Sequence, residues 1–314
     1  MSRALLITGA TGKQGASVID ALLSRNRLPP NTTILALTRD PRSPSAQRLA
    51  AKSPSIKLLE GDLDDPSAVF AAAKRLGGNS TPIWGVYSVQ VSMGKGVTLD
   101  GEVRQGKGLV DEALKAGVSH FVYSSVERGG EARSWDNPTD VPHFRTKWEI
   151  ERHLRDRAGE GKESKMGWTV LRPAIFMDNL APGFAGKLFM TSLKDVMGSR
   201  PLQWVATRDI GVFAAMAFEE PEKWNGRAVG LAGDMVTFEQ LDGLFQRVTG
   251  KPVGTTFGLL GKALKHGVKE VGTMLDFFKD EGYKADIPAL RKVHPGMMDL
   301  ETWLRTQSQF VKRE

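Results

Sequence analysis

The sequence predicts an α/β fold, in which helices cover both faces of a parallel β-sheet and a smaller C-terminal lobe follows. Three observations support this prediction. Short apolar runs alternate with segments of helical periodicity along residues 4–173. The first apolar run, residues 4–7, is followed by three glycines, Gly9, Gly12 and Gly15. A strand, a glycine-rich turn and a helix, in this order, open a Rossmann-type sheet.

The turn with three glycines carries the first functional prediction. Gly9 allows a sharp turn after the strand, Gly12 leaves room for a pyrophosphate beside the main chain, and Gly15 lets the helix pack closely on the sheet. The unpaired amides and the dipole of the helix N-terminus favour an anion. We therefore expect the turn to hold the diphosphate of a dinucleotide. The alternative is a glycine-rich turn that binds nothing.

The remaining elements follow the same alternation. Strands are expected at residues 33–38, 56–59, 83–90, 120–126 and 168–173. Helices are expected from about Gly15 and at residues 69–76, 102–116 and 141–154. Because strands and helices alternate, we expect parallel pairing with right-handed crossovers. Residues 93–101 and 127–140 are expected to be loops, the second of them lying over the site.

The residues that end the second expected strand indicate which dinucleotide is bound. Arg39 comes first after the strand and Arg42 follows closely. An arginine here suits the 2′-phosphate of an adenosine ribose, whereas an acidic residue would suit the 2′-hydroxyl. The sequence therefore favours NADP(H) over NAD(H). Asp40 would repel the phosphate if it pointed inward, and the alternative for both arginines is a solvated loop.

Two further strand ends should contribute, because ligands collect at the carboxyl ends of strands in open α/β sheets. Asp62 follows the third strand and suits the adenine amino group, while Leu63 would pack on the ring. Asp62 is alternatively the N-cap of the next helix, a role for which Asp65 competes. The end of the fourth strand should lie near the nicotinamide half of the cofactor.

Two domains are expected. Residues 1–179 form the NAD(P)-binding Rossmann domain, with strand contributions from about residues 204–232, and residues 180–314 form the smaller lobe for a substrate or partner. Beyond Leu180 the periodicity weakens, but helices are expected at residues 212–218, 237–248 and 259–279, and a strand at 229–231. Thr237, with Glu239 and Gln240 in the first turn, is expected to cap one of these helices.

The composition excludes several classes of site. The chain has 314 residues and no cysteine, so disulfides and thiolate metal sites are absent, and a cytoplasmic or nuclear location is expected. No histidine pair or carboxylate cluster indicates a metal. Lys and Arg number 43 against 36 Asp and Glu, but they are scattered, so direct nucleic-acid binding is not expected. No apolar run suits a membrane span or a signal peptide, and we expect neither.

At this point the sequence resembles the NmrA-like proteins, which are atypical members of the short-chain dehydrogenase/reductase superfamily. The resemblance rests on the glycine turn, on residues 38–42 and 60–62, and on His143-Phe144-Arg145-Thr146-Lys147. It extends to residues 172–173, 176–179 and 207–211. It implies a nucleotide-binding sheet with a smaller C-terminal lobe, and either a reductase or a redox-sensing regulator that binds a protein partner.

The resemblance also implies which residues contact NADP(H). They are Gly9, Ala10, Thr11, Gly12, Lys13, Gln14, Gly15, Arg39, Arg42, Asp62, Leu63, Ser88, Val89, Gln90, Lys147, Phe176 and Asn179.

The catalytic residues are less clearly marked. Ordinary members of the superfamily use Tyr-x-x-x-Lys, and here Lys147 stands in the lysine place while His143 stands in the tyrosine place. Either Lys147 or His143 handles a proton during hydride transfer, since histidine titrates near neutral pH and a lysine in a dry cleft has a lowered pKa. The alternatives are that Lys147 only anchors the nicotinamide ribose and that His143 faces solvent or the loop. Ser124 and Ser125 either bind a substrate or satisfy local backbone groups.

The sequence therefore predicts an NADP(H)-dependent oxidoreductase that reduces an apolar carbonyl or a conjugated small molecule. The rival prediction is a non-catalytic NADP(H) redox sensor, or transcriptional co-regulator, that acts through a regulatory protein partner.

Overall fold

The computed structural model describes residues 2–78, 81–94, 96–159, 165–258 and 269–311. The chain divides into two compact units, each assembled from three segments. Unit 1 comprises Met1–Ser125, Thr146–Leu171 and Ile210–Val229, and unit 2 comprises Val126–Arg145, Arg172–Asp209 and Gly230–Glu314. The domain boundary expected at residue 179 stays a prediction. Within the described ranges, no helix has both the length and the apolar character needed to cross a bilayer.

A seven-stranded sheet forms the centre of unit 1, in the order β3-β2-β1-β4-β5-β6-β9. Its strands are β1 (Arg3–Ile7), β2 (Thr32–Thr38), β3 (Ile56–Glu60), β4 (Ile83–Ser88), β5 (His120–Ser124), β6 (Gly167–Pro173) and β9 (Arg227–Leu231). All neighbouring pairs from β3 to β6 are parallel, as expected. The chain winds outward from β1 to β3 and then returns to β4 on the other side of β1. In open α/β sheets, ligands bind at the carboxyl ends of the strands where the order reverses, which here are β1 and β4.

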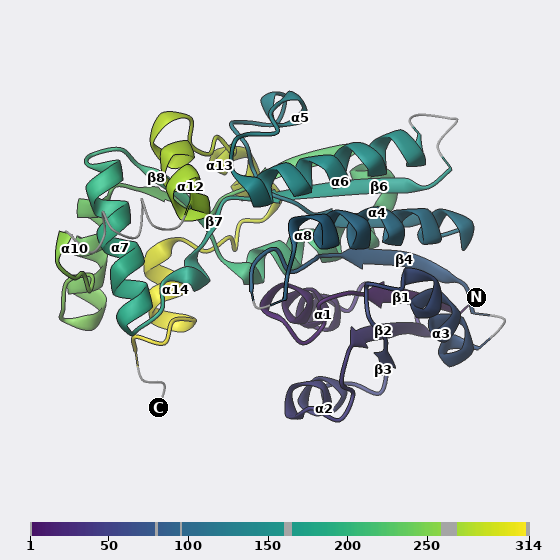
Figure 1. Cartoon of the computed structure of the whole chain (residues 1–314). Helices are drawn as coiled ribbons and strands as arrows, with labels where there is room; N and C mark the ends of the chain where they lie inside the picture. Colours follow the sequence, from purple (N-terminus) through teal and green to yellow (C-terminus); the bar gives the residue numbers. More distant parts are fainter. Residues whose placement is uncertain (1, 79–80, 95, 160–164, 259–268, 312–314) are drawn as a thin grey trace. The chain divides into compact units, whose positions relative to one another are not determined.

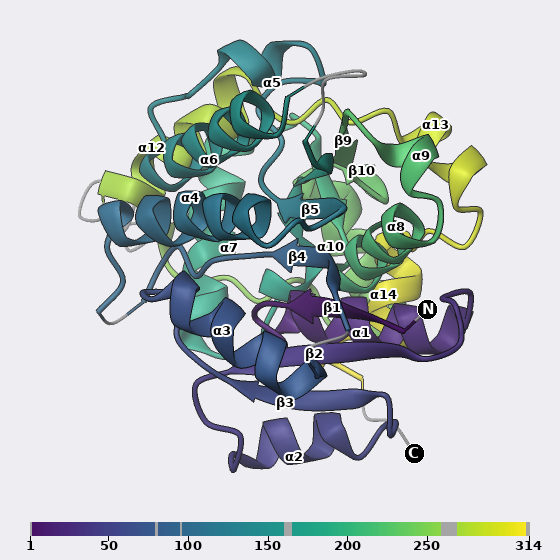
Figure 2. The ribbon, with the colours of Figure 1, turned by 90° about the vertical axis from the view of Figure 1, so that its right-hand side faces the viewer.

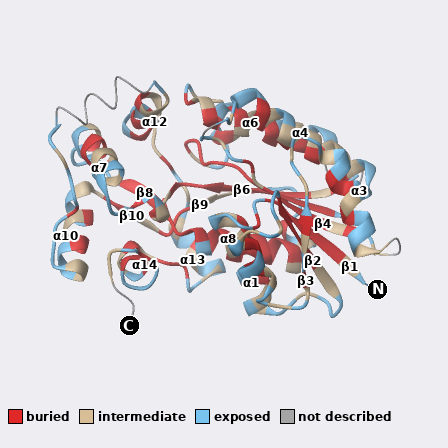
Figure 3. Cartoon of the chain, turned by 60° about the horizontal axis from the view of Figure 1, so that its bottom comes forward, coloured by how far each residue is buried: buried red, intermediate tan, exposed pale blue. Residues whose placement is uncertain are grey.

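Helices cover both faces of this sheet, which confirms the predicted fold class. They are α1 (Lys13–Arg25), α2 (Pro44–Ala50), α3 (Pro66–Gly77), α4 (Leu99–Lys115), α6 (Pro142–Ala158), α8 (Thr207–Glu219) and α9 (Pro221–Trp224). Figure 2 shows α1 and α8 on one face and α3 and α4 on the other. Strands covered on both sides carry continuous apolar runs rather than alternating ones, and Figure 3 shows the central strands almost wholly buried.

One glycine sets the distance between the two helices of the first face. A Cβ on Gly211 would lie 2.3 Å from the Ser17 carbonyl oxygen, so α8 approaches the backbone of α1 too closely for any larger residue. This contact explains why glycine stands at the end of the 207–211 motif.

Unit 2 has a smaller sheet and most of the C-terminal helices. Strand β8 (Leu202–Val205) pairs in parallel with β7 (Ile175–Phe176) and antiparallel with β10 (Asp234–Val236). The helices are α5 (Arg133–Asp136), η2 (Met177–Asn179), α7 (Phe184–Met197), α10 (Phe238–Thr249), α12 (Lys269–Asp280), α13 (Ile287–Val293) and α14 (Leu300–Thr306). Figure 1 shows α7, α10, α12 and α14 gathered near β8. Trp204, Phe245, Phe277 and Trp303 lie buried in their shared core.

Several local predictions are confirmed and several are wrong. Thr237 caps α10 with a complete capping box. The expected loop at 93–101 ends early, because Thr98 accepts a hydrogen bond from the Gly101 amide and α4 begins at Leu99. The expected loop at 127–140 contains α5. The first part of the helix expected at 259–279 lies outside the described residues, and α12 forms the remainder.

Candidate functional site

The turn from β1 into α1 has the geometry that the three glycines predict. Gly9 has a φ of +57°, and a Cβ there would meet Val89 Cγ1 at 2.8 Å. The Gly12 amide donates to the Gly9 carbonyl at 2.9 Å and closes the turn. A Cβ on Gly15 would lie 2.3 Å from the Gly9 oxygen, so the start of the helix rests directly on the turn. Gly9 therefore allows the positive φ of the turn, and Gly15 allows the close approach of the helix to the turn.

The N-terminus of α1 offers amides without a side-chain cap. Gly12 is the N-cap residue and has no side chain that accepts a hydrogen bond from the first turn. The first amides of an α-helix have no acceptor within the helix. Thr11, Gly12 and Lys13 are exposed, so the start of the helix is accessible. Such an end suits a diphosphate.

Hydrogen bonds join this turn to the ends of β4 and β5. The Thr8 hydroxyl donates to the Val89 carbonyl at 3.1 Å and accepts from the Val89 amide at 2.8 Å. The Gln14 Oε1 atom accepts from Ser124 Oγ at 2.6 Å and from the Tyr87 hydroxyl at 3.3 Å. Burial raises the pKa of Tyr87, although a hydrogen bond with Ser124 opposes this shift. The hydroxyl therefore stays protonated and can donate a hydrogen bond. Ser124 thus holds Gln14.

The loop after β2 presents two arginines to solvent. Arg39 is exposed and makes no hydrogen bond or ion pair with the described residues. Arg42 is also exposed, and its Nε lies 4.0 Å from Asp40 Oδ1. The same Asp40 oxygen accepts from the Arg42 amide at 2.9 Å. Asp40 is therefore occupied within its own loop.

In the loop after β3, Asp62 and Asp65 have different hydrogen-bond partners, and only one of them caps the next helix. Asp65 caps α3, because its Oδ1 accepts from the Ala68 amide at 2.9 Å. The exposed Asp62 instead accepts from the Asp64 amide at 3.0 Å. The N-cap alternative for Asp62 is therefore wrong, and the half-buried Leu63 follows it.

The segment that follows β4 alternates between buried and exposed side chains. Gln90 is 6 % exposed and donates through Nε2 to Ser88 Oγ at 2.9 Å. Its buried Oε1 has no partner within the part of the chain that the structure describes. Val91 is exposed, Ser92 bonds inward to Glu102, and Met93 is exposed again. The segment thus combines an unsatisfied buried acceptor with two outward apolar side chains.

Lys147 lies in an ion pair that sequence reasoning missed. Its Nζ donates to Glu102 Oε1 at 2.7 Å, and the Glu102 side chain is fully buried. A signal for Glu102 existed: residues 102, 106, 109 and 113 form one buried stripe on α4. An acid on an apolar stripe requires a partner. On the same helix Leu109, Val110 and Ala113 are buried, whereas Val103 and Leu114 are only half-buried.

His143, Phe176 and Asn179 belong to unit 2, whereas the other predicted site residues belong to unit 1. His143 is 7 % exposed, and its Nδ1 lies 2.7 Å from Glu270 Oε1 on α12. The alternative in which His143 faces solvent is therefore wrong. Phe176 is half-buried and Asn179 is exposed, at the two ends of a short turn.

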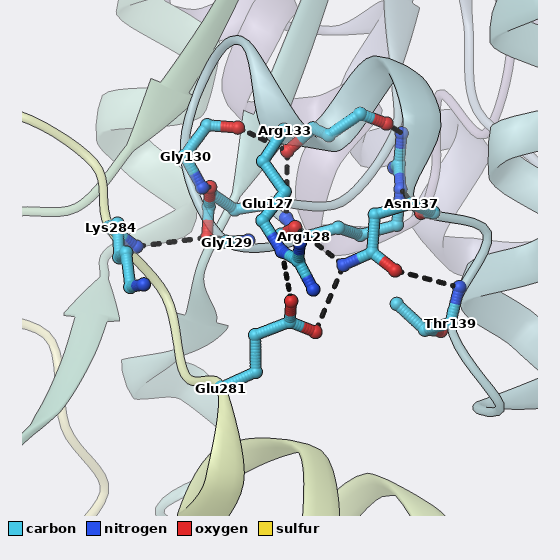
Figure 4. Close-up of polar contacts among 10 residues, drawn as sticks. Glu127, Arg128, Gly129, Gly130, Arg133, Asn137, Thr139, Glu281 and Lys284 are labelled. Carbon is cyan, nitrogen blue, oxygen red and sulfur yellow. Dashed lines mark hydrogen bonds and ion pairs between the residues drawn. The ribbon is translucent and has the colours of Figure 1, made fainter.

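Residues 127–140, expected as a polar loop, instead form a tightly bonded part of unit 2 (Figure 4). Glu127 is buried and accepts from the amides of Gly129, Gly130 and Lys284, the first and last at 3.0 Å. Arg128, also fully buried, donates to the carbonyls of Val126, Ser134 and Asn137. Glu281, at the end of α12, accepts from Arg133 and Asn137. Buried charges with this many partners fix the backbone around them.

Comparison with known proteins places these features in a family context. The model of the NmrA-like family matches residues 1–304. An NmrA-like family domain-containing oxidoreductase of Aspergillus hancockii is 30% identical over 261 residues, which cover 80% of this chain and 73% of the relative.

Solved structures share the fold at lower identity. The triphenylmethane reductase of a Citrobacter species, complexed with NADP(H), has a TM-score of 0.70 and 19% identity, and the match covers 98% of this chain and 99% of that one. Nmra, a negative transcriptional regulator, in complex with NAD has a TM-score of 0.69 and 18% identity, covering 98% and 95%. At these identities the likeness shows the fold alone.

Proposed function

The chain belongs to the NmrA-like family, and on that premise we propose that it is an oxidoreductase that binds NADP(H) at the turn between β1 and α1. The observation that carries the proposal is the geometry of this turn: Gly9 at positive φ, Gly15 against the Gly9 oxygen, and an uncapped helix start. The residues present fit a dinucleotide, because no side chain caps the first turn of the helix. The unsatisfied Gln90 Oε1 is a further polar group for the ligand.

The preference for NADP(H) rests on the loop after β2. Arg39 is exposed and unpaired among the described residues, while Asp40 accepts from the loop's own amide. A guanidinium that is not committed to a carboxylate suits a 2′-phosphate. Arg42, Asp62, Leu63, Ser88 and Val89 are proposed to complete the contacts, and Phe176 and Asn179 are proposed as further contact residues.

The substrate is proposed to be apolar. Val91 and Met93 are 62% and 56% exposed and follow directly on Gln90, at the strand end assigned to the nicotinamide half. Contiguous exposed apolar surface marks binding sites, and we propose that these two side chains are part of such a surface. A carbonyl or conjugated molecule with an apolar body suits this surface, and relatives include an NAD(P)H azoreductase of Xenophilus azovorans.

Lys147 and His143 are proposed for different tasks. When bound, the reduced nicotinamide supplies a hydride. Lys147, held by Glu102, suits a contact to the nicotinamide ribose. His143 has a carboxylate on Nδ1, and this hydrogen bond fixes the tautomer and the orientation of a ring that can titrate near neutral pH. We therefore assign the ribose contact to Lys147 and the proton to His143.

A redox sensor is the second candidate, because His143 stands where a catalytic tyrosine would and one structural neighbour is a negative transcriptional regulator. In that case the protein would bind NADP(H) and then a protein partner, without turnover.

One set of measurements separates these candidates. NADPH binding is measured by fluorescence titration, and NADPH oxidation is then followed with quinones, azo dyes and triphenylmethane dyes. The enzyme should oxidise NADPH only when an acceptor is present. Lys147→Ala should abolish this consumption, and His143→Gln should lower kcat about 100-fold while leaving the Kd for NADPH unchanged. Binding without turnover of any acceptor would favour the sensor, and absence of NADPH binding would overturn both.

A further inference from the structure

Glu102 lies at the centre of a small polar cluster in unit 1. It sits in the first turn of α4, and its side chain has no exposed surface. Its Oε1 accepts from Ser92 Oγ at 2.9 Å and from Lys147 Nζ at 2.7 Å, and its Oε2 accepts from Thr146 Oγ1 at 2.7 Å. One carboxylate therefore joins α4, α6 and the segment after β4.

The cluster stabilises the ionised form of this carboxylate. Burial alone would raise the pKa of Glu102, but Lys147 and the two hydroxyl donors together hold it below its ordinary value. Removing one partner of such a pair leaves the other charge buried without compensation. The Lys147 side chain is only 11% exposed, so it has little access to water as a replacement partner.

We propose that Glu102 is a positioning residue of the dinucleotide site, which fixes the Lys147 ammonium in place for the nicotinamide ribose. An ammonium has three N–H donors, and Glu102 takes one of them, so two remain for ribose hydroxyl groups. Loss of the proton from Lys147 would leave the buried carboxylate without its counter-charge. Lys147 thus acts as a fixed donor and not as the proton carrier. This inference rests on the proposed function, since it names a task within the same site.

The segment after β4 shares in this arrangement. Ser92 is bonded to the same oxygen as Lys147, and its neighbours Val91 and Met93 face solvent. Glu102 therefore fixes both the lysine and the backbone that carries the proposed apolar contacts. We expect Glu102→Gln to weaken cofactor binding and to raise KM for an apolar acceptor.

A double-mutant cycle tests the proposal. The Kd for NADPH is measured for the wild type, Glu102→Gln, Lys147→Met and the double variant. Glu102→Gln should weaken binding about tenfold, and in the Lys147→Met background it should cause almost no further loss, since contacting residues couple by this amount. An equal loss in both backgrounds, or no loss at all, would overturn the proposal.

A second buried ion pair supplies the matched control. Arg25 and Glu219 meet at 2.6 Å in unit 1, with side chains 18% and 2% exposed, and neither belongs to the proposed site. Glu219→Gln should lower the unfolding temperature without changing the Kd for NADPH. If Glu219→Gln weakens NADPH binding as much as Glu102→Gln does, the effect of Glu102 is general destabilisation and the positioning role is wrong.

Three results of these measurements lead to different conclusions. If Glu102→Gln does not fold, Glu102→Asp keeps the charge but withdraws the carboxylate by one methylene, and it should weaken NADPH binding about fivefold; an unchanged Kd would overturn the proposal. If the wild type itself does not bind NADPH, the proposed function fails. If the wild type binds and Glu102→Gln binds equally well, only the positioning role fails.

Discussion

The side-chain carbonyl of Gln14 accepts a hydrogen bond from Ser124 Oγ at 2.6 Å, and this contact fixes which way the Gln14 amide faces. Tyr87 donates to the same oxygen at 3.3 Å. Because both hydroxyl groups donate to Gln14 Oε1, this oxygen faces Ser124 and Tyr87, and the NH₂ group of Gln14 faces away from them. This group makes no hydrogen bond with the described residues and can donate to a bound diphosphate.

Gln14→Glu should therefore disable cofactor binding without disturbing the fold. The carboxylate still accepts from Ser124 and Tyr87, but its second oxygen replaces an NH₂ donor with a negative charge beside the phosphates. We expect the Kd for NADPH to rise more than tenfold, with an unchanged unfolding temperature. Gln246→Glu, the same change on the exposed surface of α10, is the control and should leave the Kd unchanged. Equal affinities of Gln14→Glu and the wild type would show that Gln14 does not face the phosphates.

The glycines of the turn should respond differently to alanine. A Cβ on Gly15 would lie 2.3 Å from the Gly9 oxygen, which is backbone, so Gly15→Ala should displace α1 and lower the unfolding temperature by several degrees. A Cβ on Gly12 meets the same oxygen at 3.2 Å, a contact that small shifts relieve. Gly12→Ala should therefore keep most of the stability and lose affinity for NADPH. Thermal unfolding and NADPH titration of both variants check this; equal behaviour of the two would contradict it.

Arg39→Ala should weaken NADPH binding much more than NADH binding. Arg39 is exposed and unpaired among the described residues, so its removal should change the stability of the protein little. The 2′-phosphate of NADPH, however, should lose a positively charged partner. Contacts of this kind contribute about 1.5–3 kcal/mol, or roughly 10- to 150-fold in Kd. Arg48→Ala, an exposed arginine on α2, is the control for loss of net charge. Equal losses for the two coenzymes in Arg39→Ala would show that Arg39 does not recognise the phosphate.

The sequence predicts the sheet of unit 1 well because its signals are local. The central strands contain apolar runs such as Ala4 to Ile7, and the caps Asp65 and Thr237 lie where their side chains reach the first turn. Unit 2 is predicted less well. Helices α13 and α14 have seven residues each, too few for a clear apolar period, so only signals at their ends, such as the aspartate caps, mark them. Strand β8 has four residues and depends on its partners β7 and β10.

The predicted site residues show the same division. The backbone geometry at Gly9 and Gly15 follows from the glycine spacing, because only glycine tolerates it. The partners of Lys147 and His143 do not follow, since Glu102 lies 45 residues from Lys147 and Glu270 lies 127 residues from His143. Such pairs form only when separate helices pack together, and this packing cannot be predicted from local patterns in a single sequence.

Glu127→Ala should destabilise unit 2 more than an ordinary surface change does. The buried carboxylate accepts from three backbone amides, those of Gly129, Gly130 and Lys284, and its loss leaves these donors without a partner. An unsatisfied buried group costs about 1–3 kcal/mol, and of the three bonds the one from Gly129 is fully buried, so we expect a loss of roughly 1–3 kcal/mol in the free energy of unfolding. Urea unfolding measures it, with Glu131→Ala on the exposed part of the same segment as the control. A loss below about 0.5 kcal/mol would contradict the role assigned to Glu127.

His120 should make the stability of the protein depend on pH in the mildly acidic range. The Thr169 hydroxyl donates to the Trp224 carbonyl at 2.9 Å, so at 3.0 Å it accepts from His120 Nε2–H, and the buried ring is neutral. Burial lowers the pKa of His120 from 6.5 to about 4. Between these values the unfolded chain takes up a proton that the folded chain does not, so stability rises with pH. As the pH falls below 6.5 this contribution is lost, and the loss is complete near pH 4.

Unfolding by urea at pH 7 and pH 5 measures this contribution. The wild type should lose about 2 kcal/mol through His120 between these two values, at 1.36 kcal/mol for each pH unit below 6.5. His120→Gln keeps a side-chain donor for Thr169 but does not titrate, so its free energy of unfolding should fall by about 2 kcal/mol less than that of the wild type over the same interval. The pH range separates this effect from that of Glu102, because a carboxylate whose pKa is lowered from its ordinary value of 4.5 affects stability only below that pH. Parallel pH profiles for the wild type and His120→Gln would show that the folded protein protonates His120 as readily as the unfolded chain does, which would contradict a pKa lowered by burial.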